Sequence, residues 1–299
     1  MAESDVSLDG RSAVVTGAGA GLGRAEALRL AEMGASVVVN DLGDSADDVV
    51  AEITGAGGAA VAHHGSVSDF DGAKAMVDLA IETFGDLDIV VNNAGVLRDR
   101  TVFNMSEEEW DIVIDVHLKG HFCVTKWATA HWREQAKSST EPTYGRLIGT
   151  SSEAWLGASP GQPNYSAAKA GIVALTFSAA QACRKYGVTA NVICPRARTA
   201  MTDDQPWVHT QDDSFDRFSP EHVASLVGFL ASPAAERITG EVFVVWGGLV
   251  QIVGGPRVEE RLERDDAWTP ELLASELGGH FADREGLGFL QPARAGMMG

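Results

Sequence analysis

A tyrosine and a lysine four residues apart, Tyr165 and Lys169, could carry out proton chemistry together. Four residues are about one helical turn, so both side chains would share one face of a helix. A nearby ammonium favours the phenolate, so we expect Lys169 to lower the pKa of Tyr165 from its usual value of ~10. Such a phenol can take a proton from an alcohol or return one to a carbonyl. The pair is common by chance and gains meaning only from other motifs.

A glycine-rich turn near the amino end could bind a pyrophosphate. It follows an apolar run at 12–16, and a helical pattern begins at Arg24. Glycines permit positive φ and close approach of a ligand, and a helix N-terminus offers unpaired N–H groups and a positive dipole end. The alternative is an ordinary tight turn. The residues predicted to bind the phosphates are Gly17, Gly19, Gly21, Leu22 and Gly23.

A carboxylate follows the second apolar run, where Asn40 and Asp41 come about twenty residues after the glycine turn. At this place a carboxylate can accept hydrogen bonds from both hydroxyls of an adenosine ribose, and it repels a 2′-phosphate. The alternative is a turn-starting aspartate. Asp41 therefore predicts NAD as the cofactor rather than NADP.

Short apolar runs that alternate with helical periodicity must position these residues. The runs are rich in Val, Ile and Ala with little polar alternation, as expected for strands covered by helices on both faces. They lie at 12–16, 35–40, 59–63, 88–92, 146–151, 189–194 and 241–246. The pattern predicts an α/β fold with a single Rossmann-type, doubly wound parallel sheet of about seven strands.

The composition changes after Gly248. We expect residues 1–248 to form one nucleotide-binding domain that includes the catalytic site. Residues 249–299 are rich in glycine and charge and contain one amphipathic helical pattern at 270–277. We interpret them as a C-terminal extension packed on the domain or on a neighbouring subunit.

The charge and cysteine content narrow the functional classes. The 299 residues include 23 Lys and Arg against 42 Asp and Glu, a net charge of −19. Such a charge repels nucleic acid and anionic membranes, and no apolar run reaches the roughly 18 residues of a membrane span. The start of the chain lacks the pattern of a signal peptide. The three cysteines (Cys123, Cys183 and Cys194) are widely separated, so we expect a cytoplasmic protein with no disulfide framework and no metal site.

Taken together with Asn93, Ala94 and Gly95 after the fourth predicted strand, these motifs resemble the short-chain dehydrogenase/reductase family over roughly residues 7–248. The resemblance implies that Tyr165 is the acid/base of a hydride-transfer reaction. Lys169 would tune Tyr165 and bind the nicotinamide ribose. Ser152, thirteen residues before Tyr165, would hold and stabilise the reacting oxygen. Asn93, Ala94 and Gly95 match the family's contacts on the adenosine side.

Three departures from the family pattern stand out. In the segment that meets the nicotinamide carboxamide, Pro195 and Thr199 match the family, but Arg196 replaces its glycine. Before Val67, Ser66 replaces the aspartate that usually contacts adenine, so we expect a weaker contact there. His117 stands where the family has the asparagine that orders a water in the proton relay, and we count it as a fourth catalytic residue.

His117 also favours one subgroup. Together with segments 39–43, 97–100 and 161–169, it resembles the dehydrogenase domain of the peroxisomal D-bifunctional protein and its bacterial relatives. The resemblance implies NAD-dependent oxidation of a (3R)-hydroxyacyl-CoA or a steroid-like hydroxy compound. The alternatives are a 3-oxoacyl-(acyl-carrier-protein) reductase, which Asp41 disfavours, and a non-catalytic NAD-binding scaffold. The resemblance also implies a homodimer or homotetramer, associated through a long helical pattern from 106 to 135 that carries Trp110, Trp127 and Trp132.

The segment 202–218 lies where this family covers its substrate. It contains five aspartates (Asp203, Asp204, Asp212, Asp213 and Asp216) and three aromatic residues (Trp207, Phe215 and Phe218). The aromatic side chains either line an apolar substrate pocket or pack as ordinary core. The aspartates disfavour an anionic CoA head group at this place, whereas Arg196, Arg198 and Arg217 could offset them locally, and the sequence leaves both outcomes open.

Overall fold

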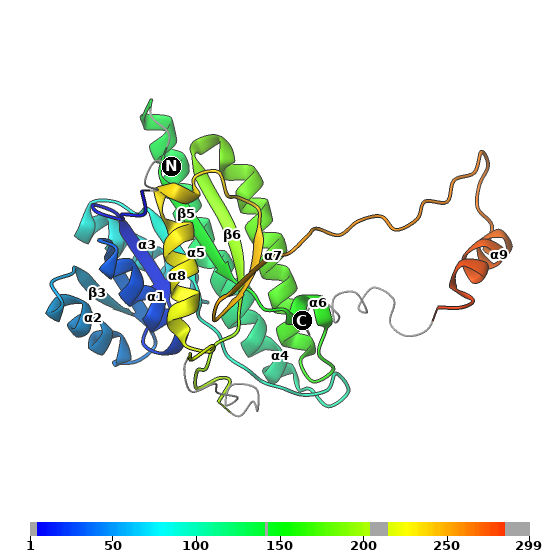
Figure 1. The fold of residues 1–299 in the computed structure, drawn as a ribbon, viewed down its shortest axis with the longest axis horizontal. Coiled ribbons are helices and arrows are strands. Elements are labelled where there is room, and N and C mark those ends of the chain that lie inside the picture. Colours follow the sequence, from blue (N-terminus) through cyan, green and yellow to red (C-terminus); the bar gives the residue numbers. More distant parts are fainter. Residues whose placement is uncertain (1–4, 141–142, 204–214, 285–299) are drawn as a thin grey trace.

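One mostly parallel sheet organises the molecule. The structure is a computed structural model that describes residues 5–140, 143–203 and 215–284. Eight strands lie in the order β3-β2-β1-β4-β5-β6-β7-β8. All neighbouring pairs are parallel except β7 and β8, which are antiparallel. The predicted doubly wound fold is therefore confirmed, with one strand more than the seven expected (Figure 1).

The strands coincide closely with the apolar runs. They are β1 (Ser12–Thr16), β2 (Ser36–Asp41), β3 (Ala60–His64), β4 (Ile89–Asn92), β5 (Gly145–Thr150), β6 (Val188–Pro195), β7 (Val242–Trp246) and β8 (Leu249–Ile252). Every residue of β1, β4 and β5 is buried, which explains why these strands show no polar alternation.

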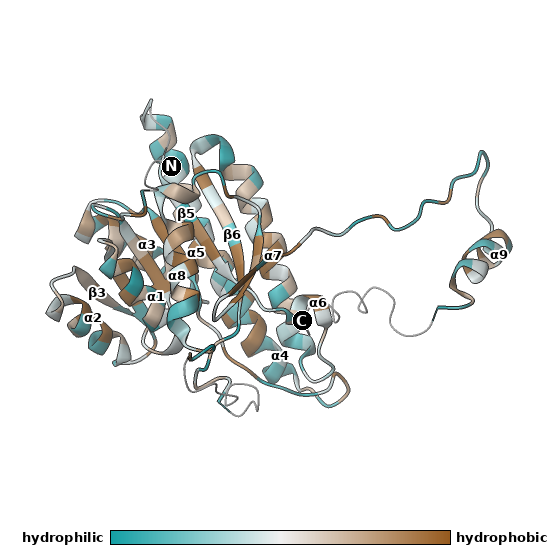
Figure 2. Ribbon diagram, in the orientation of Figure 1, coloured by the Kyte–Doolittle hydropathy of each residue, from teal (hydrophilic) through white to brown (hydrophobic). Residues whose placement is uncertain are grey.

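Helices cover both faces of the sheet. They are α1 (Gly21–Glu32), α2 (Ser45–Gly55), α3 (Phe70–Phe84), α4 (Glu107–Val113), α5 (Gly120–Ser138), α6 (Ala154–Gly157), α7 (Pro163–Cys183), α8 (Pro220–Ala231) and α9 (Pro270–Phe281), with short helices η1 (Ile114–Lys119), η2 (Arg184–Tyr186) and η4 (Pro233–Ala235). Helices α1, α2 and α8 pack against one face of the sheet through the buried side chains of Leu30, Val49 and Val227, respectively. Met76 and Trp132 bury α3 and α5 against the other. Figure 2 shows the resulting apolar strands between helices with polar outer surfaces.

The order of the strands defines where a ligand can bind. β1 pairs with β2 on one side and with β4 on the other, so the chain changes direction between β1 and β4. In open α/β sheets a crevice forms at this switch point, outside the carboxyl ends of the strands. The loops after β1 and β4 flank that crevice.

The long helical pattern at 106–135 is interrupted in the structure. Helix α4 continues into the π-helix η1, and α5 follows directly. A π-helix holds one extra residue per turn, and such bulges occur frequently at functional sites. His117 lies within η1, so the bulge sets the direction of its side chain.

The C-terminal residues divide into two parts. β8 extends the sheet beyond residue 248, whereas the chain after Ile252 leads away from the sheet to α9 (Figure 1). Helix α9 spans Pro270–Phe281, four residues longer than the pattern predicted, and none of its residues is buried against the described part of the chain. Packing of this extension on a neighbouring subunit stays a prediction. Within the described residues, no helix is long and apolar enough to cross a membrane.

Candidate active site

A cavity of about 370 Å³ opens at the carboxyl end of the sheet. Its lining includes most of the residues singled out from the sequence: Gly17, Gly21, Leu22, Asp41, Ser66, Val67, Asn93, Ala94, Gly95, His117, Tyr165, Lys169, Pro195 and Thr199. Gly19, Gly23 and Ser152 do not belong to the lining. The structure therefore brings together segments from across the whole sheet, and each of the three remaining residues directly adjoins a lining residue in the chain.

The glycine turn is packed so tightly that side chains would not fit. Gly17 has φ +62°, and a Cβ on it would lie 2.8 Å from the Cα of Ala94. A Cβ on Gly23 would lie 2.3 Å from the carbonyl oxygen of Gly17. Gly19 donates its N–H to Asp41 Oδ2 at 2.9 Å. Gly19 and Gly23 thus shape the turn, while Gly17 presents its backbone to the cavity.

Thr16 is a residue of the site that the sequence reasoning missed. Its Oγ1 accepts hydrogen bonds from the backbone N–H groups of Asn93, at 2.9 Å, and Ala94, at 3.1 Å. The side chain of Asn93 donates in turn to the carbonyl oxygens of Thr16 and Gly17. These bonds join the ends of β1 and β4 across the switch point. The signal in the sequence was a hydroxyl residue directly before the first glycine.

Asp41 ends β2 at the edge of the cavity. Its Oδ1 accepts a hydrogen bond from the N–H of Leu42 at 2.7 Å, and Oδ2 accepts the bond from Gly19. The carboxylate is therefore fixed beside the glycine turn. The glycine turn leaves a space that side chains would fill, and the Asp41 carboxylate lies beside that turn. This arrangement fits a nicotinamide dinucleotide whose pyrophosphate would lie at the turn and whose adenosine would lie beside Asp41.

Ser152, Tyr165 and Lys169 form one cluster. Pro163 starts α7 and places Tyr165 in its first turn. The side chain of Ser152 accepts from the backbone N–H of Ala154 at 3.2 Å and lies near enough to the Tyr165 hydroxyl to act on its pKa. Lys169 Nζ lies 5.2 Å from the centre of the Tyr165 ring and donates to the carbonyl oxygen of Thr150 at 2.6 Å. The three groups expected to act together therefore do lie together.

The pKa of Tyr165 differs from the expectation. Burial raises it to about 12, and the hydrogen bond with Ser152 offsets only part of that rise. Burial also lowers the pKa of Lys169 to about 7. The expected lowering of the Tyr165 pKa was wrong because burial outweighs the neighbouring groups, and Lys169 directs its ammonium at the main chain of β5.

His117 lies against the tyrosine, with the two rings edge to face and their centres 5.3 Å apart. Its Nε2 is 3.0 Å from the backbone nitrogen of Val96 and 2.8 Å from its carbonyl oxygen. Burial and the charge of Lys169 lower the pKa of His117 well below 6.5, so the imidazole is neutral. Nδ1 is buried and has no hydrogen-bond partner among the described residues. Such an atom is suited to hold a water molecule.

Asn164, the residue before Tyr165, locks the start of α7 in place. Its side-chain N–H groups donate to the carbonyl oxygens of Arg98, at 3.0 Å, and Glu109, at 2.9 Å. It thereby ties two segments that are far away in the sequence to the catalytic helix. No pattern in the sequence indicated these partners beyond the adjacency of Asn164 and Tyr165.

The segment expected to cover the substrate is described only in part. Trp207, Asp204, Asp212 and Asp213 lie outside the described residues. Phe215 is 45% exposed and packs its ring against His222, 4.8 Å away. Arg198 forms an ion pair with Asp216.

No group of three or more His, Cys, Asp or Glu residues in the described part of the chain lies where it could hold a metal ion. His121, one turn after His117, is fully buried, and burial together with Lys169 lowers its pKa to about 3.

Comparisons with known proteins agree with this fold. Residues 17–250 match a family model described as enoyl-(acyl carrier protein) reductase. The chain belongs to the short-chain dehydrogenase/reductase family, as the sequence motifs indicated. It is thus an oxidoreductase that acts on CH–OH groups with a nicotinamide nucleotide.

Among its relatives, the chain is 53% identical over 290 residues to hydroxyacyl-CoA dehydrogenase ChsB1 of Mycobacterium tuberculosis, covering 93% of this chain and 90% of that protein. It is 42% identical to peroxisomal multifunctional enzyme type 2 of Mus musculus over 90% of this chain, but it spans only 36% of that longer protein. A solved short chain dehydrogenase from Mycobacterium avium superposes with a TM-score of 0.83 at 44% identity, covering 93% of this chain and 97% of that one.

Proposed function

We propose that this protein is an NAD-dependent dehydrogenase that interconverts a (3R)-hydroxyacyl-CoA, or a steroid-like hydroxy compound, and the corresponding ketone. The observation that carries the proposal is the contact of Ser152, Tyr165 and His117 beside Lys169 at the cavity. The relationship with hydroxyacyl-CoA dehydrogenase ChsB1 over nearly the whole chain supports the thioester substrate. The resemblance of His117 and of segments 39–43, 97–100 and 161–169 to the D-bifunctional subgroup supports the (3R) configuration.

Tyr165 is the group that exchanges a proton with the substrate oxygen, and Ser152 holds that oxygen. With a pKa of about 12, Tyr165 keeps its proton at neutral pH and is ready to give it to a carbonyl. A bound nicotinamide nucleotide supplies or accepts the hydride at the substrate carbon. Lys169, with a pKa of about 7, can carry a proton away from Tyr165 during alcohol oxidation. The unpaired Nδ1 of His117 would hold a water molecule that continues this path.

The choice of NAD rests on Asp41. Both of its oxygens are already fixed by backbone N–H groups, so the carboxylate cannot turn away from a ribose 2′-phosphate placed beside it. Asp41→Ala removes this repulsion, and we expect the preference for NAD over NADP to fall by about tenfold or more. Steady-state kinetics with both cofactors measure the change. An unaltered ratio would remove Asp41 from this role and reopen the 3-oxoacyl-(acyl-carrier-protein) reductase alternative.

A substrate panel tests the proposed reaction. NADH formation is followed with medium-chain (3R)-hydroxyacyl-CoA, its (3S) epimer, a 17β-hydroxysteroid and a simple polyol, each with NAD and with NADP. We expect turnover of the (3R) thioester with NAD. Turnover of only the steroid or the polyol would keep the reaction type and reject the thioester. No turnover with NAD still bound would reject all four candidate substrates and mean that the pocket takes a different one.

We also propose a homodimer or homotetramer in the cytoplasm, with residues 1–248 as the catalytic domain and 249–299 as an extension. Trp110 on α4 and Phe122 on α5 are 39% and 45% exposed, which supports a covered face there. Trp132 is instead fully buried in the core of its own chain. Mass measurement in solution that finds only a monomer would reject the association.

A further inference from the structure

The segment after β5 is fastened to the end of β6 by alternate residues. The backbone N–H of Ser151 donates to the carbonyl oxygen of Ile193 at 2.8 Å. The side chain of Ser151 donates to the carbonyl oxygen of Lys169 on α7 at 2.8 Å. Ser152, the next residue, lies beside Tyr165 instead. The anchoring of its neighbours thus leaves Ser152 on the catalytic side of the segment.

The strongest of these anchors is an ion pair between Glu153 and Arg196. Arg196 Nε lies 2.6 Å from Glu153 Oε2, and its Nη2 lies 2.8 Å from Oε1. The side chains are only 26% and 14% exposed. The guanidinium also stacks on Trp246, with 4.0 Å between its central carbon and the centre of the indole, and the backbone N–H of Arg196 donates to Val245. A bidentate, stacked and largely buried pair of this kind is far more rigid than an exposed ion pair.

The pair joins the two loops that face each other across the reacting groups. Glu153 directly follows Ser152, and Arg196 directly follows Pro195, which lines the cavity. Arg196 also stands where the family pattern has a glycine, which has no side chain to form such a bond. Because Arg196 is engaged with Glu153, it is less suited to attract an anionic substrate than the sequence suggested.

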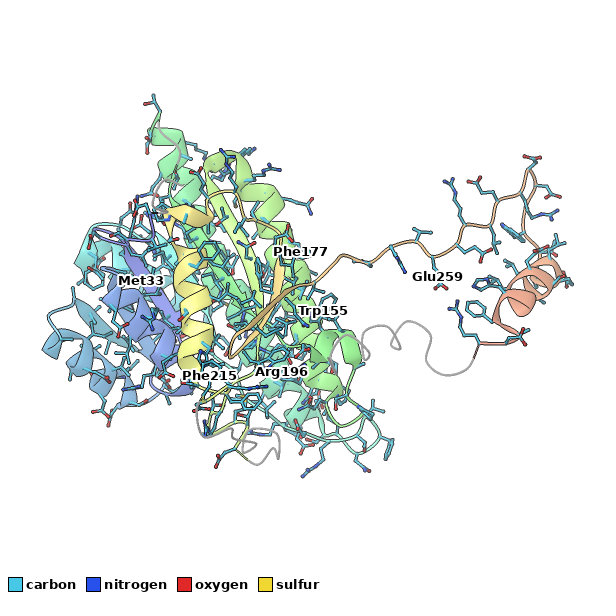
Figure 3. All side chains as sticks on the ribbon, viewed as in Figure 1. Met33, Trp155, Phe177, Arg196, Phe215 and Glu259 are labelled. Carbon is cyan, nitrogen blue, oxygen red and sulfur yellow. The ribbon has the colours of Figure 1, made fainter. Side chains whose placement is uncertain are left out.

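We propose that the Glu153–Arg196 ion pair positions Ser152 against the reacting oxygen, and so controls the rate of hydride transfer without touching the substrate. The proposal rests on the role of Ser152 in the proposed function. Glu153 and Arg196 are positioning residues: each acts through the backbone of the residue that precedes it. Figure 3 shows Arg196 and Trp155 at the same end of the sheet as the cavity.

The test is a double-mutant cycle with Arg196→Met, Glu153→Gln and the combined variant, with Arg196→Lys as the conservative change. Arg24→Met is the matched control, because it breaks the exposed Arg24–Glu52 pair between α1 and α2. The readouts are kcat, KM, the isotope effect with alcohol deuterated at the reacting carbon, NADH affinity and the unfolding midpoint.

Each single variant should lower kcat by on the order of tenfold and raise the isotope effect, because hydride transfer becomes slower. The combined variant should be no worse than either single variant, since both break one interaction. NADH affinity should stay unchanged, Arg196→Lys should recover part of kcat, and Arg24→Met should match the wild type.

Three results would overturn the proposal: additive losses, a rise in KM with an unchanged kcat and isotope effect, and a fall in kcat that only follows a loss of folded protein. The second result would assign Arg196 to substrate binding. Failure of the proposed function looks different, because the wild type would then oxidise no substrate of the panel. An active wild type with an unaffected Arg196→Met variant rejects the positioning role alone.

Discussion

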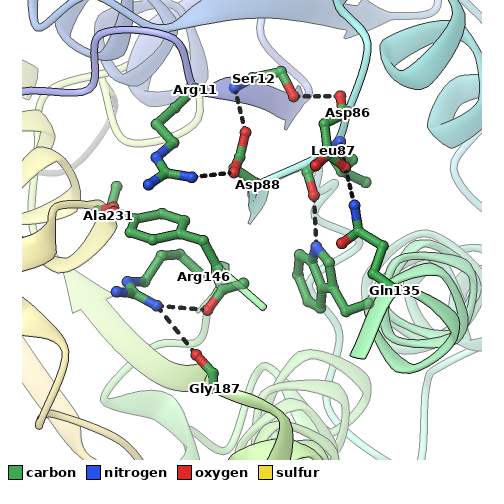
Figure 4. Close-up of polar contacts among 12 residues, drawn as sticks. Arg11, Ser12, Asp86, Leu87, Asp88, Gln135, Arg146, Gly187 and Ala231 are labelled. Carbon is green, nitrogen blue, oxygen red and sulfur yellow. Dashed lines mark hydrogen bonds and ion pairs between the residues drawn. The ribbon is translucent and has the colours of Figure 1, made fainter. Parts of the chain in front are cut away.

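The two ends of the sheet differ in whether their polar groups have hydrogen-bond or ion-pair partners. At the amino end, Asp88 accepts from the Arg11 guanidinium and from the backbone N–H of Ser12, both at 2.9 Å (Figure 4). Tyr144 lies between the guanidinium groups of Arg11 and Arg146, whose central carbons are 3.8 and 3.9 Å from its ring centre. Its hydroxyl donates to Ala231. Almost every charged group here has a partner, although Arg146 Nε has none among the described residues.

At the carboxyl end, several buried polar atoms lack a hydrogen-bond partner among the described residues. His117 Nδ1, His121 Nε2 and Thr150 Oγ1 have no hydrogen-bond partner among the described residues, and Lys169 is buried without a carboxylate beside it. Unpaired buried groups cost stability, so proteins keep them mainly where substrate, cofactor or water will complete them. The amino end of the sheet therefore stabilises the fold, whereas the carboxyl end is less stable because its polar groups are kept available for the reaction.

The largest expected effect comes from Lys169→Met. Turnover should fall by about 1,000-fold or more, because the proton path from Tyr165 is lost. The free energy of unfolding should nevertheless rise, since a buried ammonium is replaced by an apolar chain. Turnover assays and denaturant titrations measure the two changes.

Lys169→Met should also change how the free energy of unfolding depends on pH. The pKa of Lys169 is about 7 in the folded protein, against 10.5 for the ordinary side chain. The unfolded chain therefore binds the extra proton between these values, and this group makes stability rise as the pH increases from about 7 to 10.5. Lys169→Met should lack that rise. A variant that is less stable than the wild type at pH 7 would contradict the comparison.

Asp88→Asn probes the amino end. The amide can still hydrogen-bond a neighbour but cannot pair ionically with Arg11, so the free energy of unfolding should fall by about 2 kcal/mol. Turnover per folded molecule should not change, because the strands separate Asp88 from the cavity. Chemical unfolding measures the free energy of unfolding, and active-site titration gives the turnover per folded molecule. A loss of turnover without a loss of stability would show that the amino end of the sheet also contributes to catalysis.

Glu26 in α1 is an exception, because it is a buried polar group without a partner in the described part of the chain and does not line the cavity. It is fully buried, neither of its carboxylate oxygens has a partner among the described residues, and burial raises its pKa from 4.5 to about 8. The folded protein holds this proton while the unfolded chain loses it, so stability falls as the pH rises from 4.5 to about 8.

Glu26→Gln should remove that fall and leave the protein more stable at pH 8 by about 1 kcal/mol. Turnover should stay unchanged, because Glu26 is not part of the cavity lining. Thermal unfolding of both proteins at pH 5 and pH 8 measures the difference. A loss of turnover would mean that this open carboxyl group also serves the reaction.

Local patterns predicted most of the fold. β1 and β5 are continuous apolar runs because both of their faces are covered. The search for continuous apolar runs did not predict β8, because β8 is an edge strand. Its residues alternate between partly buried and exposed, with Val250 and Ile252 facing outward. The π-helix η1 escaped notice because one extra residue hardly changes the helical periodicity.

The site was predictable where its residues are close in the chain. Tyr165 and Lys169 share a helix, and the glycine turn carries its own spacing. Glu153 and Arg196 are far apart in the sequence, so no spacing could pair them. The pKa of Tyr165 was predicted in the wrong direction because it depends on burial, which only the packed structure determines.

Tyr165→Phe offers the most direct test of the central claim, that a buried tyrosine at the carboxyl end exchanges the proton. NADH binding and single-turnover hydride transfer should be measured on the wild type and the variant under identical conditions. We predict unchanged NADH affinity and a hydride-transfer rate at least about 1,000-fold lower. A variant that binds NADH normally and keeps a substantial part of the wild-type rate would contradict the account, because the proton would then come from another group.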